Sequence, residues 1–203
     1  MTPGIVAFLS ILALIILWVT GWFPRLPRDA GLSSGNEFFG WLLAASVSSV
    51  VEISITPAMT LHAGVLWLLS AFLRLVQRVS KADRLSVGAA ILFFGFNFFI
   101  AGEMTIIDPA WVLFPLQHFC LAFLVGFTLL VTPRLNRRLA ILTGGMFLGI
   151  LLSSASHPSL SGEIGIGSPV YWDMSWISMI ALTSLHYFLS WAERRYFRFK
   201  AKI

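Results

Sequence analysis

Seven long apolar stretches follow one another along the chain and constrain its fold more than any other feature. They lie at 3–23, 38–55, 57–76, 85–102, 109–131, 139–155 and 169–191. A helix needs roughly 20 apolar residues to cross a hydrocarbon core of about 30 Å, so each stretch has about the length of one crossing. The sequence therefore predicts an all-α integral membrane protein, a seven-transmembrane helix bundle that forms a single domain over residues 1–203.

The composition argues against a soluble protein. Hydrophobic residues make up 58% of the chain, charged residues make up 11%, and the mean hydropathy is +0.86. No Lys or Arg precedes the first stretch, which is longer than the apolar part of a signal peptide, so we expect it to persist as a helix. The single cysteine, Cys120, leaves no internal disulfide or thiolate metal site.

A polar residue followed by proline begins four of the seven stretches. The four polar residues are Thr2, Thr56, Asp108 and Ser168. An N-capping side chain before a proline is typical of a helix start. These four pairs precede the first, third, fifth and seventh stretches, which would all begin on the same side. Because the second and third stretches are almost continuous, Thr56 and Pro57 predict a tight helical hairpin between them.

The basic residues orient the predicted bundle. All fourteen lie beside the ends of the odd-numbered stretches: Arg25, Arg28, Arg74, Arg78, Lys81, Arg84, Arg134, Arg137, Arg138, Arg194, Arg195, Arg198, Lys200 and Lys202. Because Lys and Arg are retained in cytoplasmic loops, the N-terminus is predicted outside and the C-terminus in the cytoplasm. The net charge of +5 then indicates contact with anionic lipid headgroups at the cytoplasmic face rather than with nucleic acid.

Small residues mark two predicted helix contacts. Gly145 and Gly149 have the GxxxG spacing that allows close approach of helices in membranes, and Gly88, Gly95 and Gly102 recur every seven residues. We expect both seams to face neighbouring helices.

Polar residues within the apolar stretches are the candidate site residues, because such groups are costly at membrane depth. Those predicted in the outer half of the bundle are Glu52, His62, Asn97, Glu103 and His118. Two interpretations are open. They converge in an outer-leaflet cavity that binds a cation, a proton or a polar headgroup, or they form interhelical hydrogen bonds that hold the bundle together.

No catalytic template supports an enzyme. The sequence contains no HExxH, GxSxG or P-loop motif, and no catalytic residue, metal site or cofactor is predicted. The first hypothesis is a non-enzymatic accessory, scaffold or sensor component, with a membrane protein partner or a second copy as its neighbour. The alternatives are a small transporter or ion-handling protein that uses the outer polar residues, and an enzyme acting on lipid or cell-wall intermediates.

The order of spans, the length and the first apolar helix ending in Val19, Thr20, Gly21 and Trp22 resemble the YphA-like small membrane proteins of Gram-positive bacteria. The resemblance covers the whole chain. It implies a multi-pass protein of the bacterial plasma membrane and carries no established activity.

Overall fold

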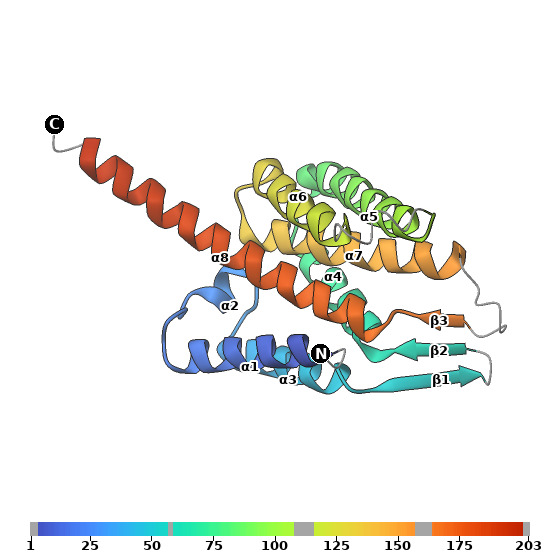
Figure 1. Ribbon diagram of the computed structural model, residues 1–203. Coiled ribbons are helices and arrows are strands. Elements are labelled where there is room, and N and C mark those ends of the chain that lie inside the picture. The colour runs from blue at the N-terminus through green and yellow to red at the C-terminus, as the bar shows by residue number, and fades with distance from the viewer. Residues whose placement is uncertain (1–3, 57–58, 108–115, 157–163, 201–203) are drawn as a thin grey trace.

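The computed structural model describes residues 4–56, 59–107, 116–156 and 164–200, and most of them are helical (Figure 1). The long helices are α1 (Ile5–Val19), α3 (Gly35–Ser48), α4 (Ala63–Gln77), α5 (Arg84–Ile107), α6 (Leu116–Val131), α7 (Leu135–Ser156) and α8 (Pro169–Lys200). Two short elements, α2 (Leu26–Asp29) and the 3-10 helix η1 (Lys81–Asp83), lie in the connections. Each long helix overlaps one predicted stretch, although several bounds differ.

Three short strands show that the all-α prediction is incomplete. They are β1 (Glu52–Thr56), β2 (Met59–His62) and β3 (Ile164–Ile166), with β2 in the middle, antiparallel to β1 and parallel to β3. The predicted helical hairpin at Thr56 and Pro57 is therefore wrong. The helix expected to reach residue 55 ends at Ser48, and the helix expected to begin at residue 57 begins at Ala63.

The residues of β1 show a sequence pattern that is typical of a strand. In β1 the polar Glu52, Ser54 and Thr56 alternate with the β-branched Ile53 and Ile55, which is a period of two rather than 3.6. All five residues are exposed. Figure 1 shows the three strands side by side at one end of the molecule, below the end of α7, and we call this the sheet end.

Of the four predicted helix starts, the structure confirms the one at Ser168 and contradicts the one at Thr56. The cap at Ser168 is confirmed, because its Oγ accepts a hydrogen bond from the backbone N–H of Tyr171 at 3.5 Å and α8 begins with Pro169. The pairs at residues 2–3 and 108–109 lie outside the described residues. At the start of α4 the cap is His62.

The predicted glycine seam on α7 is confirmed. A Cβ at Gly145 would lie 2.5 Å from Phe94 Cδ1, and one at Gly149 would lie 2.7 Å from Phe98 Cδ1. Both phenylalanines belong to α5, so close packing of α5 on α7 needs these two glycines. The seam on α5 is only partly used. Gly95 contacts Leu148, whereas nothing lies within 4 Å of a Cβ at Gly88.

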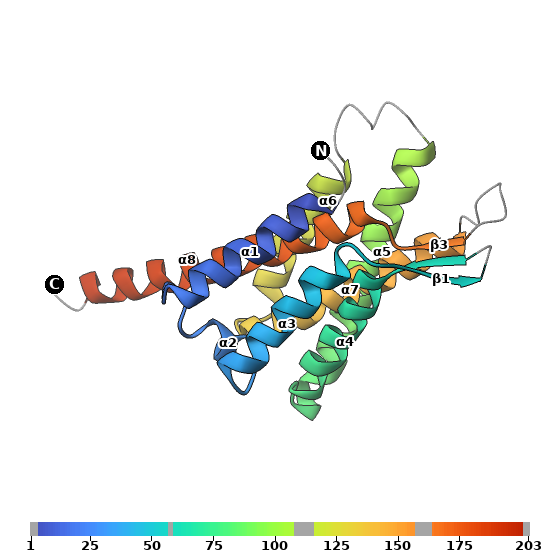
Figure 2. The ribbon, with the colours of Figure 1, turned by 90° about the horizontal axis from the view of Figure 1, so that it is seen from below.

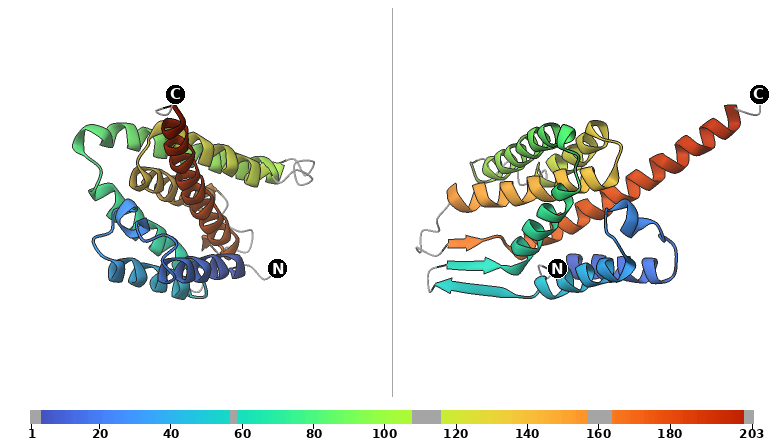
Figure 3. Two further views of the ribbon diagram at one scale, coloured as in Figure 1. Left: turned by 90° about the vertical axis from the view of Figure 1, so that its left-hand side faces the viewer. Right: turned by 180° about the vertical axis from the view of Figure 1, so that it is seen from behind.

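The connections at the other end of the helices meet one another, and we call this the basic end. A Cβ at Gly31 would lie 3.5 Å from both Arg78 and Asn136, which brings together the α2–α3 connection, the end of α4 and the start of α7. Arg137 forms a salt bridge with Asp83 at 2.5 Å. Figures 2 and 3 show that α1 and α8 start close together and both run toward this end, where the last part of α8 extends past the other helices.

Large apolar side chains also cover much of the outer surface. The exposed ones include Leu9, Val19, Leu43, Val47, Leu92, Phe93, Phe96, Ile100, Phe123, Leu130, Ile177 and Phe188. Such a surface exceeds the scattered apolar patches of soluble monomers. Within the residues that the structure describes, two helical segments, Lys81–Met104 and Leu135–Ser156, are long and apolar enough to cross a membrane, and the other apolar helices found there are shorter.

Candidate functional site

Two of the five predicted site residues, Glu52 and His62, lie opposite each other in the β1–β2 hairpin. Glu52 is exposed, whereas the His62 side chain is only 4% exposed. The Nδ1 atom of His62 accepts a hydrogen bond from the Gly64 N–H at 3.2 Å and so caps α4. Burial lowers the pKa of His62, and the negative charges of Glu52 and Asp173 oppose this shift. The neutral imidazole therefore serves a structural role at this helix start.

The other predicted site residues belong to helices away from the hairpin. Asn97, on α5, donates from Nδ2 to the Phe93 carbonyl at 2.7 Å and so satisfies its amide within its own helix. Glu103 is also on α5 and is partly buried. The side chain of His118 lies outside the described part of the chain. In Figure 1, α7 and β3 lie between α5 and the β1–β2 hairpin.

Asp173, near the start of α8, binds the backbone of another helix. Its carboxylate accepts hydrogen bonds from the backbone N–H groups of Gly4 at 2.8 Å and Ala7 at 2.7 Å. These are donors that the first turn of α1 leaves without helical partners. Asp173 thus caps α1 from α8 and fixes the two helices side by side.

Four indoles beside this contact form an aromatic cluster. The rings of Trp67 and Trp172 are 5.5 Å apart, those of Trp67 and Trp176 are 5.3 Å apart, and those of Trp41 and Trp67 are 5.8 Å apart. The Nε1 atom of Trp67 donates to the Trp41 carbonyl at 3.0 Å. The cluster joins α3, α4 and α8, with His62 packed against Trp172.

A cavity of about 110 Å³ lies next to this cluster, between α1, α2, α3, α4, α7 and α8. A single water needs roughly 10–15 Å³, so the cavity is large enough for a larger molecule or part of one. Three of the indoles line it, those of Trp41, Trp67 and Trp176. Most of the remaining lining is apolar and includes Leu14, Leu26, Phe38, Leu42, Leu75 and Met179.

Polar groups in the cavity wall are few. The Trp176 side chain is buried, and its Nε1 atom has no hydrogen-bond partner among the described residues. Arg74 also lines the cavity, and its guanidinium binds the Glu37 carboxylate at 2.8 Å. Thr143 and Thr183 complete the polar lining. The lining thus combines apolar side chains with a buried indole, that of Trp176, and with Arg74, whose charge is paired with that of Glu37, and such a lining suits the chain of an amphipathic molecule.

Residues 38–202 match the family described as YphA-like integral membrane protein. The chain belongs to this family. The match covers more than half of the sequence and confirms the family that the resemblance indicated, although the opening helix lies outside the matched residues. No curated protein and no solved structure matches the chain.

In this YphA-like protein, the residues around the cavity were not identified from the sequence. The lining of the cavity includes none of the five predicted site residues. The sequence holds one signal, because Trp67 lies in the middle of the apolar stretch 57–76, away from the membrane interfaces that indoles prefer. Among the described residues, no three His, Cys, Asp or Glu side chains gather as metal ligands would.

Proposed function

We propose that this integral membrane protein crosses a bacterial plasma membrane seven times, with its N-terminus outside and its C-terminus in the cytoplasm. The exposed apolar helix surfaces and the basic connections gathered at one end support this orientation. The sheet favours an outer membrane boundary at the sheet end of the molecule. Open strand edges do not occur in contact with lipid inside the hydrocarbon core, so the exposed β1 belongs in the outer headgroup region or in water.

Within that arrangement we propose a non-enzymatic role as a sensor or accessory protein that binds an alkyl chain of a membrane-derived amphipathic molecule. The cavity beside Trp176 carries this proposal. An unsatisfied buried donor costs about 1–3 kcal/mol, and a hydroxyl or carbonyl oxygen on a bound chain would accept the Trp176 N–H bond. The apolar walls would bury the chain itself.

Filling the cavity tests this proposal. Ala71 lines the cavity and is 7% exposed, so Ala71→Met should occupy the space for a ligand. The probe is 1-decanol, added to the full chain purified in detergent, and the measurement is the probe-induced rise in the thermal unfolding midpoint. We expect this rise in the wild type and its loss in Ala71→Met. Ala89→Met, at an exposed position of α5, should behave as wild type.

The unfolding midpoint measured without the probe shows whether Ala71→Met changes ligand binding or folding. Ala71→Met should unfold without the probe at or above the wild-type midpoint, because the added side chain fills existing space. An equal decanol response in both variants and the wild type would show that the alcohol acts on the micelle and would overturn the cavity proposal.

Single-cysteine labelling tests the orientation. In a Cys120→Ala background, Ile55→Cys places a thiol in exposed β1 and Lys81→Cys places one at the basic end. An impermeant maleimide added to intact cells should label position 55 and leave position 81 unlabelled until the membrane is opened. Labelling of both positions from outside would contradict the seven-span topology.

The alternative of an ion-handling protein is supported by the pairing of Glu52 with buried His62 at the sheet end. Glu52→Gln should then change proton flux into vesicles that contain the purified chain, while the decanol response stays intact. Unchanged flux in this variant would count against the alternative.

A further inference from the structure

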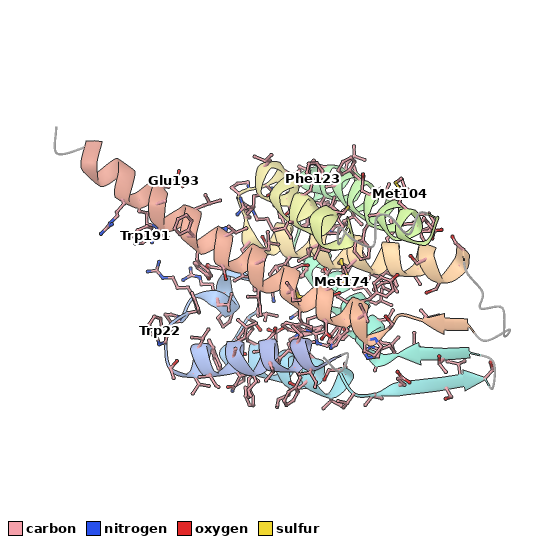
Figure 4. The ribbon with its side chains drawn as sticks, in the orientation of Figure 1. Trp22, Met104, Phe123, Met174, Trp191 and Glu193 are labelled. Carbon is pink, nitrogen blue, oxygen red and sulfur yellow. The ribbon has the colours of Figure 1, made fainter. Side chains whose placement is uncertain are left out.

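A second hollow, of about 430 Å³, lies at the basic end between the connection that follows α1 and the later part of α8. We call it the basic groove. Trp22 and Trp191 line it from opposite elements, as do the arginines Arg25 and Arg194. Figure 4 labels the two indoles, with Trp22 after α1 and Trp191 on the extended part of α8.

The lining of the basic groove holds more positive than negative charge. The one carboxylate in its lining, that of Asp29, accepts a hydrogen bond from the Tyr187 hydroxyl at 2.8 Å. Arg25 and Arg194 are both exposed, and two guanidiniums against one carboxylate leave the lining with a net positive charge. A third guanidinium, that of Arg195, lies 4.8 Å from the centre of the Trp191 ring and packs on it.

The basic groove follows the cavity along α8. On that helix Trp176, Met179 and Thr183 line the cavity, and Tyr187, Ser190, Trp191 and Arg194 continue the same stripe into the groove. The helix α2 separates the two hollows, because Leu26 and Ala30 line the cavity, whereas the adjacent Arg25 and Asp29 line the groove. An apolar site and a cationic site therefore lie in series.

We propose that the basic groove binds the phosphate-bearing headgroup of an anionic phospholipid from the surrounding membrane. Arginine guanidiniums match the geometry of phosphate oxygens, and indoles prefer the headgroup level of a bilayer. Trp22 comes three residues after α1 ends at Val19, so the groove lies at that level. The inference rests on the proposed placement of the basic end at the membrane surface.

Lipid selectivity in detergent tests the site independently of orientation. The full chain in micelles receives phosphatidylglycerol or phosphatidylcholine with identical acyl chains, and native mass spectrometry counts the bound lipid. We expect phosphatidylglycerol to bind at least about fivefold more tightly than phosphatidylcholine, which corresponds to about 1 kcal/mol. Arg25→Gln combined with Arg194→Gln should remove this difference. Arg134→Gln, which changes another exposed arginine of the basic end, should keep it.

Several results would overturn the headgroup site or assign it to a ligand other than a phospholipid. Equal binding of the two lipids by the wild type, or selectivity retained in the double variant, would overturn the headgroup site. Binding of soluble glycerol phosphate with equal affinity would show a free phosphate ligand and would overturn the lipid assignment. If the double variant fails to fold, Arg194→Gln alone gives the test, because Arg194 lies on the exposed part of α8. Ala71→Met should keep the lipid selectivity, so failure of the cavity proposal is seen separately.

Discussion

The Asp173 carboxylate of α8 lies 2.7 Å from the backbone nitrogen of Ala7 in α1 and accepts its hydrogen bond. These residues are 166 positions apart in the chain. The contact joins the starts of the first and last long helices beside buried His62 and the tryptophan cluster, which includes Trp172, the residue before Asp173. The packing of α1 on α8, and with it one wall of the cavity, depends on this carboxylate.

Loss of this cap should therefore destabilise the whole sheet end. Asp173→Ala leaves the N–H groups of Gly4 and Ala7 without their acceptor and should lower the free energy of unfolding by about 1–3 kcal/mol. Asp173→Asn keeps one acceptor oxygen and should lie between this variant and the wild type. Thermal unfolding in detergent measures the effect. Glu193→Ala, at an exposed position of α8, should change the midpoint little, and a similar loss in that control would contradict the capping role.

Arg138 should be the most sensitive arginine for folding. It is 6% exposed, and its guanidinium donates to the carbonyls of Thr132 at 2.5 Å and Leu129 at 2.9 Å, while Nη1 lies 2.7 Å from His186 Nδ1. Arg138→Ala removes the cap on the end of α6 and a link to α8, so we expect a loss of about 3 kcal/mol in denaturant unfolding. Arg134→Ala should cost less than about 0.5 kcal/mol, because surface substitutions have small effects.

Gly145 on α7 and Gly126 on α6 should respond in opposite ways to substitution by alanine. Gly145→Ala places a methyl group 2.5 Å from Phe94 and should destabilise the protein by about 1–3 kcal/mol through overpacking. Gly126→Ala on α6, where nothing lies within 4 Å, should stabilise it by up to about 1 kcal/mol through helix propensity. Thermal unfolding of the two variants in parallel checks both signs. A stable Gly145→Ala variant would show that α5 and α7 do not need their close approach.

Stability should fall in mildly acidic solution because of His62. Burial lowers its pKa in the folded state below the ordinary 6.5, so as the pH falls below 6.5 the unfolded chain binds a proton that the folded chain does not. The free energy of unfolding then decreases by up to about 1.4 kcal/mol per pH unit until the folded-state pKa is reached. The full contribution of neutral His62 is present above pH 6.5.

The control for this pH effect is His62→Asn. Asparagine can still cap α4 and does not titrate. Comparison of unfolding midpoints between pH 5 and 7.5 should show a smaller slope in the variant than in the wild type. Equal slopes would assign the acid sensitivity to other groups.

Part of the candidate site could be predicted and part could not. The tryptophans and Arg74 are visible in the sequence, yet their convergence depends on α3, α4 and α8, which are far apart in the chain. Polar residues at membrane depth drew attention to Glu52, His62, Asn97, Glu103 and His118. Two of these, His62 and Asn97, bond to backbone groups close to them in sequence, and a sequence pattern does not distinguish such local bonds from bonds to a ligand. Convergence of the five in one cavity stays a prediction.

The sequence by itself determined the membrane class, the family, and the number and order of the long helices in the described residues, because runs of apolar residues must be buried in lipid or protein whatever their partners. It also showed the spacing of the α7 glycines that allows α7 to pack closely on α5. Only the tertiary structure decided that residues 59–62 pair with residues 164–166 in a sheet, that Asp173 caps a different helix, and that three indoles line a cavity. These features depend on hydrogen bonds and contacts between distant segments, and the energy of such contacts is absent from any local pattern.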